Sequence, residues 1–496
     1  MNQKDWTAED KYRPYDQWDP MYHQELVAKA ANSQWRQVFH IQPESGLLND
    51  PNGFSYFDGK WHLFYQAFPF GTIHGLKSWY HMQSDDLIQW ESLGEAIRPE
   101  TKYESHGAYS GSAYPLADEL RLFYTGNVRD EHFERHAYQL GATYKNGRIT
   151  KNQQPLIGDL PAGYTAHFRD PQVFKHQGVY YMLLGAQTTD LQGEILIYRS
   201  EDLAHWHLVG PMAFKEQSLG YMMECPHIVG LEKEPILIFC PQGLDKQIID
   251  YDTPHPNTYL LGGHVDLEKG QFEATSNLQN LDDGFDSYAT QAMDMPDGRT
   301  LAVSWLGTPE YEYPVIRDAW TNCLSLVKEL TVKNQQLYQY PVQEINQYKT
   351  LVTRGESTSL SEQIVYQPTT NHYELEVVFE ANQQATLFLL ADEQNSRSLK
   401  IDVDTTFGKV TVDRSNVGIE KINETVSVRT SQVAQHQPMR LNIFVDTSSV
   451  EIFINQGERV LSLLAFPEPS DTTIYATVGQ GTVHYQLSMI GNKCNK

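Results

Sequence analysis

From about residue 360 the chain alternates between apolar and polar residues with a period of two. Such runs occupy residues 373–379, 385–390 and 449–455, and a Gln-Gly turn follows the last one. Side chains that alternate in this way point to opposite faces of a strand, so each run predicts a half-buried β-strand. Short strands in close succession, in a region without tryptophan, are typical of a β-sandwich, which we expect over residues 360–496.

The front of the chain contains internal repeats. The heptapeptide Ser-Asp-Asp-Leu-Ile-Gln-Trp at 84–90 returns as Ser-Glu-Asp-Leu-Ala-His-Trp at 200–206, and the Asp-Pro segment at 50–54 returns at 170–174. Related units begin at residues 50, 110, 170, 224 and 291, and each contains a short apolar strand. Five similar units of about four short strands predict a five-bladed β-propeller. One large sheet with chance similarity between its parts is the alternative.

These patterns divide the chain into four segments. We expect an N-terminal extension at 1–37, a propeller at 38–347, a polar linker at 348–359 and the sandwich at 360–496. Helical periodicity is sparse, and residues 24–35 of the extension are its best example. The predicted fold class is therefore all-β, with a five-bladed β-propeller followed by a C-terminal β-sandwich.

The composition narrows the classes of partner. The 496 residues include 63 acidic and 38 basic side chains, which gives a formal net charge of −25. Binding to nucleic acid or to an anionic membrane needs a basic field, so we expect neither partner. The N-terminus has no apolar stretch of signal-peptide length, and no uncharged apolar run approaches the roughly 18 residues of a spanning helix. We therefore expect a cytoplasmic, soluble protein, and leave open whether it is a monomer or a homodimer.

The cysteines and histidines give no sign of a metal site or a disulfide framework. Cys225, Cys240, Cys323 and Cys494 are far apart, and the 18 histidines show no ligand spacing such as HExxH. We therefore expect no metal and no cofactor. Cys225 follows an acidic residue directly, but because no His/Asn partnership is evident we interpret it as a packing residue and not as a nucleophile.

Acidic residues stand where the repeated units begin. In chain order the units open with Asp50, Ser110, Asp170 and Glu224. A propeller brings the starts of its inner strands around one axis, and three carboxylates in one pocket repel one another unless function keeps them there. Glycoside hydrolysis needs one ionised carboxylate and one protonated carboxyl group. Asp50 alone is also explained by an ordinary Asp-Pro turn, and Asp170 by a surface ion pair with Arg169. An acid in an apolar strand start, as at Glu224, is harder to explain in that way.

Longer motifs surround these acids. The three that contain them are His-Ile-Gln-Pro-Glu-Ser-Gly-Leu-Leu-Asn-Asp-Pro-Asn-Gly at 40–53, Phe-Arg-Asp-Pro at 168–171 and Glu-Cys-Pro at 224–226. Others lie at 63–66, 79–81, 109–112, 283–291, 305–307 and 320–326. Together they resemble glycoside hydrolase family 32, the β-fructofuranosidases that include invertases, sucrose-6-phosphate hydrolases, inulinases and levanases. The resemblance covers roughly residues 38–490 and keeps the family's order and spacing.

The resemblance implies a role for each acid. Asp50 would be the catalytic nucleophile, Glu224 the general acid/base, and Asp170 the third carboxylate, which holds fructose hydroxyls and stabilises the transition state. The implied substrate-binding residues are Asn49, Gln66, Trp79, Ser110, Arg169 and Trp305. The family fold is a five-bladed propeller with a C-terminal β-sandwich, in agreement with the repeats.

This family hydrolyses β-fructofuranosides with retention, which predicts that the carboxyl groups of Asp50 and Glu224 lie about 5–5.5 Å apart. We expect burial and nearby negative charges to raise the pKa of Glu224, so that this group is protonated near neutral pH. A nucleophile that must be ionised and an acid that must be protonated predict a bell-shaped pH profile.

Substrate preference depends on the walls of the pocket, where the chain departs from the common family pattern. Ala67-Phe68-Pro69 stands where Tyr-Asn-Pro is usual, Tyr80 replaces a glycine, and Ser287 replaces a common aromatic residue. The resemblance and the missing export signal favour sucrose 6-phosphate, with sucrose also accepted, and Lys77 and His74 are suggested phosphate ligands. The alternatives are an intracellular fructo-oligosaccharide hydrolase or invertase without a phosphate requirement, a fructosyltransferase and, more remotely, a carbohydrate-binding propeller without catalysis.

Overall fold

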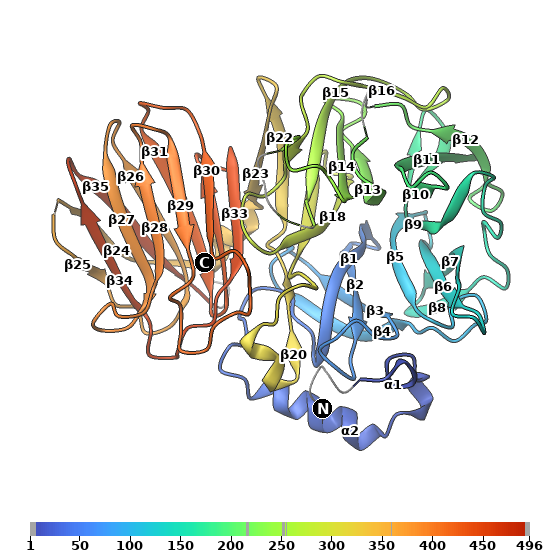
Figure 1. Ribbon diagram of the computed structural model, residues 1–496, viewed down its shortest axis with the longest axis horizontal. Coiled ribbons are helices and arrows are strands. Elements are labelled where there is room, and N and C mark those ends of the chain that lie inside the picture. The colour runs from blue at the N-terminus through green and yellow to red at the C-terminus, as the bar shows by residue number, and fades with distance from the viewer. Residues whose placement is uncertain (1–5, 215–217, 250–252, 254, 359, 492–496) are drawn as a thin grey trace. The chain divides into compact units, whose positions relative to one another are not determined.

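The computed structural model describes residues 6–214, 218–249, 253, 255–358 and 360–491, and Cys494 lies outside them (Figure 1). The chain forms two compact units. The first comprises the described residues of Met1–Glu25, Ser45–Leu281 and Tyr288–Trp305, and the second those of Leu26–Glu44, Asp282–Ser287 and Leu306–Lys496. Both units consist mostly of β-strands, which confirms the all-β prediction.

The first unit contains four groups of antiparallel strands that pair in chain order. They are β1 (Gly46–Phe57), β2 (Lys60–Phe68), β3 (Ser78–Ser84) and β4 (Trp90–Ile97); β5 (Ala108–Pro115), β6 (Leu120–Arg129), β7 (Arg135–Lys145) and β8 (Arg148–Lys151); β9 (Tyr164–His176), β10 (Val179–Thr188), β11 (Gly193–Ser200) and β12 (His207–Pro211); and β13 (Met222–Val229), β14 (Ile236–Gln242), β15 (Thr258–Asp266) and β16 (Gln271–Ala274), with β17 (Gln279–Asn280) beside β15. A fifth pair, β18 (Ser287–Asp294) and β19 (Thr300–Leu306), follows. Each repeated sequence unit thus contributes the first strand of one group.

The five first strands, which we call the ring strands (β1, β5, β9, β13 and β18), form a closed ring. A side chain of one strand accepts a hydrogen bond from the backbone of a neighbour in five pairs: Asn52 from Gly111, Ser112 from Val173, Gln172 from Ile228, Asp294 from Gly230 and Gln291 from Phe54. Because β18 bonds to Gly230, directly after β13, and to Phe54 of β1, the ring of five strands closes. This is the arrangement of a five-bladed β-propeller, as predicted.

The second unit contains the predicted sandwich. One six-stranded antiparallel sheet has the order β24 (Lys349–Ser357), β35 (Val483–Ile490), β26 (His372–Phe379), β31 (Met439–Asp446), β32 (Ser449–Ile454) and β33 (Arg459–Leu464). The other has the order β25 (Gln363–Tyr366), β34 (Thr473–Val478), β27 (Gln384–Ala391), β28 (Leu399–Asp404), β29 (Lys409–Asp413) and β30 (Val428–Gln432). The inward residues of both sheets form one apolar core, as expected from the alternating pattern. The unit also contains η3 (Pro314–Asp318), β20 (Trp320–Thr321), β21 (Cys323–Leu324), the hairpin of β22 (Lys328–Lys333) with β23 (Gln336–Pro341), and η4 (Gln343–Tyr348).

Two local predictions differ from the structure. Helix α2 (Pro20–Ala31) begins and ends earlier than the predicted 24–35, because Asp19 accepts the Met21 N–H and proline suits the first helical turn. The segment 348–359, predicted as a linker, contains strand β24, which pairs with β35. Most of β24 is exposed, as is common for an edge strand, and its polar surface resembles a linker in sequence.

The remaining helices are short. They are α1 (Ala8–Lys11) and η2 (Tyr15–Gln17), both in the N-terminal extension. Within the part of the chain that the structure describes, no helix has the length and apolar character that crossing a membrane requires.

Candidate active site

The three acids lie at matching irregularities of their ring strands. The pairing with the next strand is interrupted at Asn49–Asp50 in β1, at Asp170–Pro171 in β9 and at Cys225–Pro226 in β13, and at each place two residues lie opposite one. The same β-bulge occurs in β5, around Ser110. A bulge re-aims side chains and tolerates proline, because its residues are released from the regular ladder. The repeated Asp-Pro and Cys-Pro pairs in the sequence therefore mark the bulges that present the acids.

Two of the bulges hold their backbone in the left-handed region. Asp170 has a φ of 65° and Cys225 a φ of 49°. This region is unfavourable for residues with a Cβ, and such strain persists only where the surrounding structure enforces it. The Cys225 N–H consequently points at Asp170, and donates to its Oδ2 at 3.0 Å.

Asp50 is held by a network of polar side chains. Ser110 Oγ donates to Oδ2 of Asp50 at 2.5 Å, and Asn49 Nδ2 donates to Oδ1 at 3.0 Å. Gln66 Nε2 donates to Ser110 Oγ, and Lys77 Nζ donates to Asn49 Oδ1 at 2.6 Å. Burial raises the pKa of Asp50, with the bonds from Ser110 and Asn49 opposing the shift. The network thus fixes the carboxylate and partly compensates its loss of solvent.

Glu224 has the opposite environment. Arg169 donates to Oε1 through Nε at 3.1 Å and Nη2 at 2.6 Å. Oε2 accepts bonds from Tyr288 Oη at 2.5 Å and from Gln242 Nε2 at 2.8 Å. Burial by itself raises the pKa of Glu224, but the charge of Arg169 and the bonds from Tyr288 and Arg169 outweigh it and lower the pKa. The expectation that this group has a raised pKa is therefore wrong for the structure without substrate, in which Glu224 is ionised.

Asp170 completes the acid cluster. Burial raises its pKa to about 7, opposed by Arg169 and assisted by the negative charges of Glu224 and Asp50. The Cys225 thiol links the carboxylates, because its Sγ lies 3.7 Å from Asp170 Oδ2 and 4.0 Å from Asp50 Oδ2. Burial and the adjacent carboxylates raise the pKa of that thiol, so Cys225 is a packing residue with an unreactive thiol, as interpreted from the sequence.

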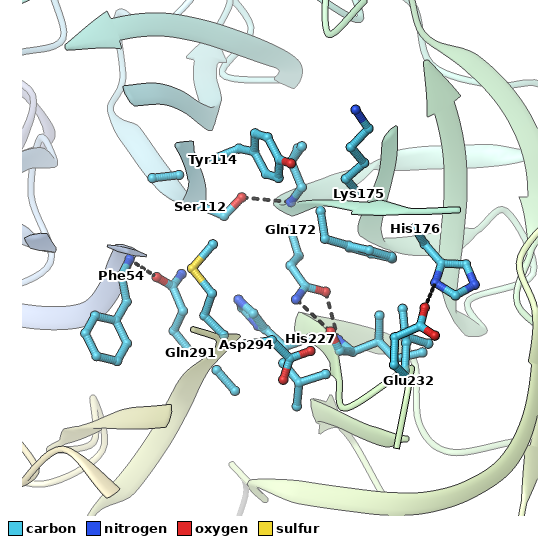
Figure 2. A pocket seen from close by; sticks show the side chains of 18 residues that line it. Phe54, Ser112, Tyr114, Gln172, Lys175, His176, His227, Glu232, Gln291 and Asp294 are labelled. Carbon is cyan, nitrogen blue, oxygen red and sulfur yellow. Dashed lines mark hydrogen bonds and ion pairs between the residues drawn. The ribbon is translucent and has the colours of Figure 1, made fainter. Parts of the chain in front are cut away.

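A cavity of about 280 Å³ lies further along the same ring strands (Figure 2). Its lining includes Ser112, Gln172 and His227, each two or three positions after the residues of the bulges. All five ring strands contribute to the lining, and none of the three acids does. The cavity is therefore the interior of the ring and is distinct from the acid cluster.

Comparisons with known proteins agree with this geometry. The family description "Glycosyl hydrolases family 32 N-terminal domain" matches residues 40–341, and "Glycosyl hydrolases family 32 C terminal" matches residues 336–490. The chain belongs to glycoside hydrolase family 32. The predicted family and the predicted class of enzyme, a glycoside hydrolase, are thereby confirmed.

Individual relatives of this family 32 chain are similar over nearly their whole length. The chain is 45% identical to a sucrose-6-phosphate hydrolase of Pediococcus pentosaceus over 92% of this chain and 91% of the relative. It is 44% identical to a sucrose-6-phosphate hydrolase of Streptococcus mutans over 96% and 98%. A solved structure of sucrose-6-phosphate hydrolase from Lactobacillus gasseri has 42% identity and a TM-score of 0.93, covering 98% of this chain and 99% of that one.

The other residues that the family resemblance implied lie at different distances from the acids. Asn49, Gln66, Ser110 and Arg169 bond directly to Asp50, to Glu224 or to one another. Trp305 is buried beside the Tyr288 ring, with ring centroids 6.4 Å apart. Trp79 is fully buried, and its indole N–H donates to the Tyr109 carbonyl at 3.0 Å. Trp79 thus supports the bulge that carries Ser110.

Two residues of this family 32 site, Tyr288 and Gln242, were not assigned to it from the sequence. Tyr288 lies within the motif at 283–291, which could have indicated it. Gln242 ends the middle strand β14, where no motif marks it. Lys77, suggested above as a phosphate ligand, is buried and donates to Asn49 beside Asp50, and burial lowers its pKa to about 7.

Proposed function

We propose that the chain hydrolyses terminal β-D-fructofuranosides with retention of configuration, and that its preferred substrate is sucrose 6-phosphate. The observation behind the proposal is the cluster of three carboxylates, Asp50, Asp170 and Glu224, which lie at or beside equivalent bulges and have little contact with solvent. The names of the relatives with 42–45% identity support the phosphorylated substrate. A Bombyx mori β-fructofuranosidase described in complex with sucrose, 28% identical with a TM-score of 0.83, supports the reaction.

In the first step Asp50 attacks C2 of the fructosyl unit. The bond from C2 to the glucosidic oxygen breaks, an ester bond between Asp50 and C2 forms, and Glu224 gives its proton to the leaving oxygen. In the second step Glu224 takes a proton from water, the water oxygen attacks C2, and the ester bond breaks to release fructose and Asp50. Asp170 stabilises the positive charge of the fructosyl group in both transition states.

The protonation pattern of the three acids adds a requirement to this mechanism. Near neutral pH the acids share a proton that favours the aspartates, because Arg169 holds Glu224 in its ionised form. Glu224 can act as the acid only when it carries that proton. We infer that the substrate oxygen takes over part of the bonding of Oε1, weakens the contact with Arg169 and raises the pKa of Glu224.

The proposed substrate also bears on the compartment in which the enzyme works. A phosphate ester carries a charge that does not cross a bilayer unaided, so the enzyme would meet it in the compartment where it is formed, for which we propose the cytoplasm.

The test is the steady-state kcat/KM of the purified chain for sucrose 6-phosphate, sucrose and 1-kestose, measured in parallel from released fructose. We expect fructose to be released from sucrose 6-phosphate and from sucrose, with the highest kcat/KM for sucrose 6-phosphate. Equal or better turnover of 1-kestose would reject the phosphorylated substrate and support an oligofructoside hydrolase. No release from any fructoside would reject the reaction itself.

A further inference from the structure

Three arginines surround one histidine next to the acid cluster. His167 Nδ1 lies 3.1 Å from Arg135 Nη1 and 3.1 Å from Arg169 Nη1. Arg129, at the end of β6, adds a third positive charge whose field reaches both His167 and Arg135. Side chains from β6, β7 and β9 therefore converge here.

The bonds to His167 define its hydrogen positions. Both arginines can only donate, so Nδ1 of His167 must be the acceptor and carries no proton. Burial and the charges of Arg169 and Arg135 lower the pKa of His167 to about 4, so the ring is neutral. The remaining nitrogen, Nε2, then carries the hydrogen and is a donor. The two arginines and Nε2 of His167 therefore present N–H donors and no acceptor.

The cluster lacks the carboxylates that such a group of charges normally attracts. Within the described residues neither Arg129 nor Arg135 forms an ion pair, although the chain has 63 acidic side chains against 38 basic ones. Asp130, which follows Arg129 in the chain, accepts the backbone N–H groups of His132 and Glu134 and contacts His136. Half-buried guanidinium groups without a counter-charge are costly, and an anion would relieve this cost.

Aromatic side chains are among the groups packed around the cluster. Arg135 interacts electrostatically with Tyr109 and Tyr12 as well as with Arg169 and Arg129. The Tyr12 ring makes a tilted contact with His106 and an edge-on contact with Phe133, with ring centroids 4.9 Å and 6.0 Å away. Arg169 is the arginine that faces carboxylates, those of Glu224 and, more weakly, of Asp170 in the catalytic cluster.

The position of the cluster relates it to one end of the substrate. Arg169 bridges Glu224 and His167, so the arginines extend outward from the acid that protonates the leaving oxygen. That oxygen belongs to the glucose unit. The fructose side, by contrast, faces Asp50 and its network, where Lys77 is already bonded to Asn49.

We propose that Arg135, Arg129 and the Nε2–H of His167 bind the phosphate group that a phosphorylated substrate carries on its glucose unit. The inference rests on the proposed function, and deepens it by assigning the residues that select sucrose 6-phosphate over sucrose. Arginine suits this task because its planar fork donates two parallel bonds to phosphate oxygens.

The experiment compares wild type, Arg135→Gln, Arg129→Gln, Arg135→Lys and the control Arg148→Gln. Arg148 is an exposed arginine in β8, at the far edge of the same group of strands. For each variant we would measure kcat/KM for sucrose 6-phosphate and for sucrose at pH 7.5, where the phosphate is largely a dianion. A second readout is competitive inhibition of sucrose hydrolysis by glucose 6-phosphate relative to glucose, which needs no turnover of the phosphorylated substrate.

We expect each glutamine variant to lower the kcat/KM for sucrose 6-phosphate, relative to that for sucrose, by about 10- to 100-fold. Inhibition by glucose 6-phosphate should weaken by a similar factor. Arg135→Lys should retain more of both than Arg135→Gln, and Arg148→Gln should match wild type. Remaining sucrose hydrolysis and the thermal unfolding curve show that each variant is folded.

Two failures are distinguishable. A wild-type preference for sucrose 6-phosphate that both glutamine variants keep would overturn this assignment and leave the proposed function intact. A wild type that hydrolyses sucrose but neither prefers the phosphorylated substrate nor is inhibited better by glucose 6-phosphate than by glucose would overturn the proposed substrate and this site together.

Discussion

Each of the two units buries a cluster of charged side chains, and the clusters are balanced differently. In the second unit His40 lies between Asp446, at 2.8 Å, and Glu451, at 2.9 Å, and all three side chains are buried. In the first unit three carboxylates share Arg169 and Lys77, and the pKa of Lys77 is lowered to about 7.

The second unit repeats its pattern at another place. Arg414 lies fully buried between Asp286 and Glu424, and its guanidinium packs over the Phe285 ring. Both oxygens of Asp446 also accept backbone N–H groups, from Val38 and Phe39, and Oε1 of Glu451 accepts the N–H of Leu326, whereas Oε2 of Glu451 has no hydrogen-bond partner among the described residues. Hydrogen bonds and charges from both partners raise the pKa of His40 to about 9 against the effect of its burial, so it is a cation.

Structural and functional clusters of buried charge differ in how well their charges are balanced. A buried acid that meets a full cation and has its lone pairs bonded stabilises a connection in the fold. Buried acids that exceed their cations shift one another's pKa values, which costs stability and persists where chemistry needs it. Mutations in the two clusters should therefore have opposite consequences for activity and stability.

The largest expected effect is the loss of activity in Asp50→Asn. The variant keeps the shape of the side chain but removes the nucleophile, so kcat for sucrose should fall by about 10⁴-fold or more. Because burial disfavours the charge at this position, the thermal midpoint should stay equal or rise. Kinetics and thermal unfolding beside Asp118→Asn, an exposed acid, provide the measurement. A marked loss of stability in Asp50→Asn would contradict the comparison.

The second effect is on stability, in His40→Gln. Removal of the cation leaves Asp446 and Glu451 buried and unpaired, which should cost about 3–5 kcal/mol in the free energy of unfolding. The matched control is His484→Gln, because the contact of His484 with Glu356 is exposed and should change stability by less than about 1 kcal/mol. Urea unfolding at pH 6 measures both. Equal effects of the two variants would show that the buried triad is not structural.

The third effect is the pH dependence of the same stability. The pKa of His40 is about 9 in the folded chain and near 6.5 when unfolded, so its contribution is complete below pH 6.5 and is lost as pH rises through 9. The stability difference between wild type and His40→Gln should shrink by about 3 kcal/mol between pH 6 and pH 9.5. A difference that stays constant with pH would mean that His40 is neutral in the folded chain.

The smallest effect is a pH shift in Tyr288→Phe. The Tyr288 hydroxyl donates to the ionised form of Glu224, so its removal should raise the pKa of Glu224. Because Glu224 must be protonated to act as the acid, the alkaline limb of kcat/KM should move up by about one pH unit. Tyr164→Phe is the control, since Tyr164 donates to Glu194. A downward or absent shift in Tyr288→Phe would remove this role of the hydroxyl.

Much of the fold was accessible from sequence because it is repeated. The Asp-Pro and Cys-Pro pairs mark bulges in successive ring strands, and a periodic signal of that kind survives without any three-dimensional information. Two of the acids could be predicted for the same reason, because Asp50 and Asp170 stand directly before the prolines of their bulges, and Glu224 directly precedes the Cys-Pro pair of the third. Strand β24 was missed because an exposed edge strand has the polarity of a linker.

The ionisation of Glu224 could not be predicted from the sequence. It depends on Arg169, which is 55 residues away in the chain and donates two bonds to Oε1. Gln242 comes from the strand next to β13 and stands in no motif. Such contacts depend on the register between neighbouring strands. The hydrophobic pattern shows which face of the sheet a side chain lies on, but not which residue lies opposite it on the next strand.

The net charge of −25 has a consequence for how fast a phosphorylated sugar reaches this molecule. At an ionic strength of 0.01 M the field extends about 30 Å, so the whole acidic surface repels a dianion before the arginines can attract it. At 0.1 M the range falls to about 10 Å, and the repulsion fades while the half-buried arginines are screened less. For the proposed substrate, added salt should therefore speed encounter, the reverse of the electrostatic steering that a positive surface gives.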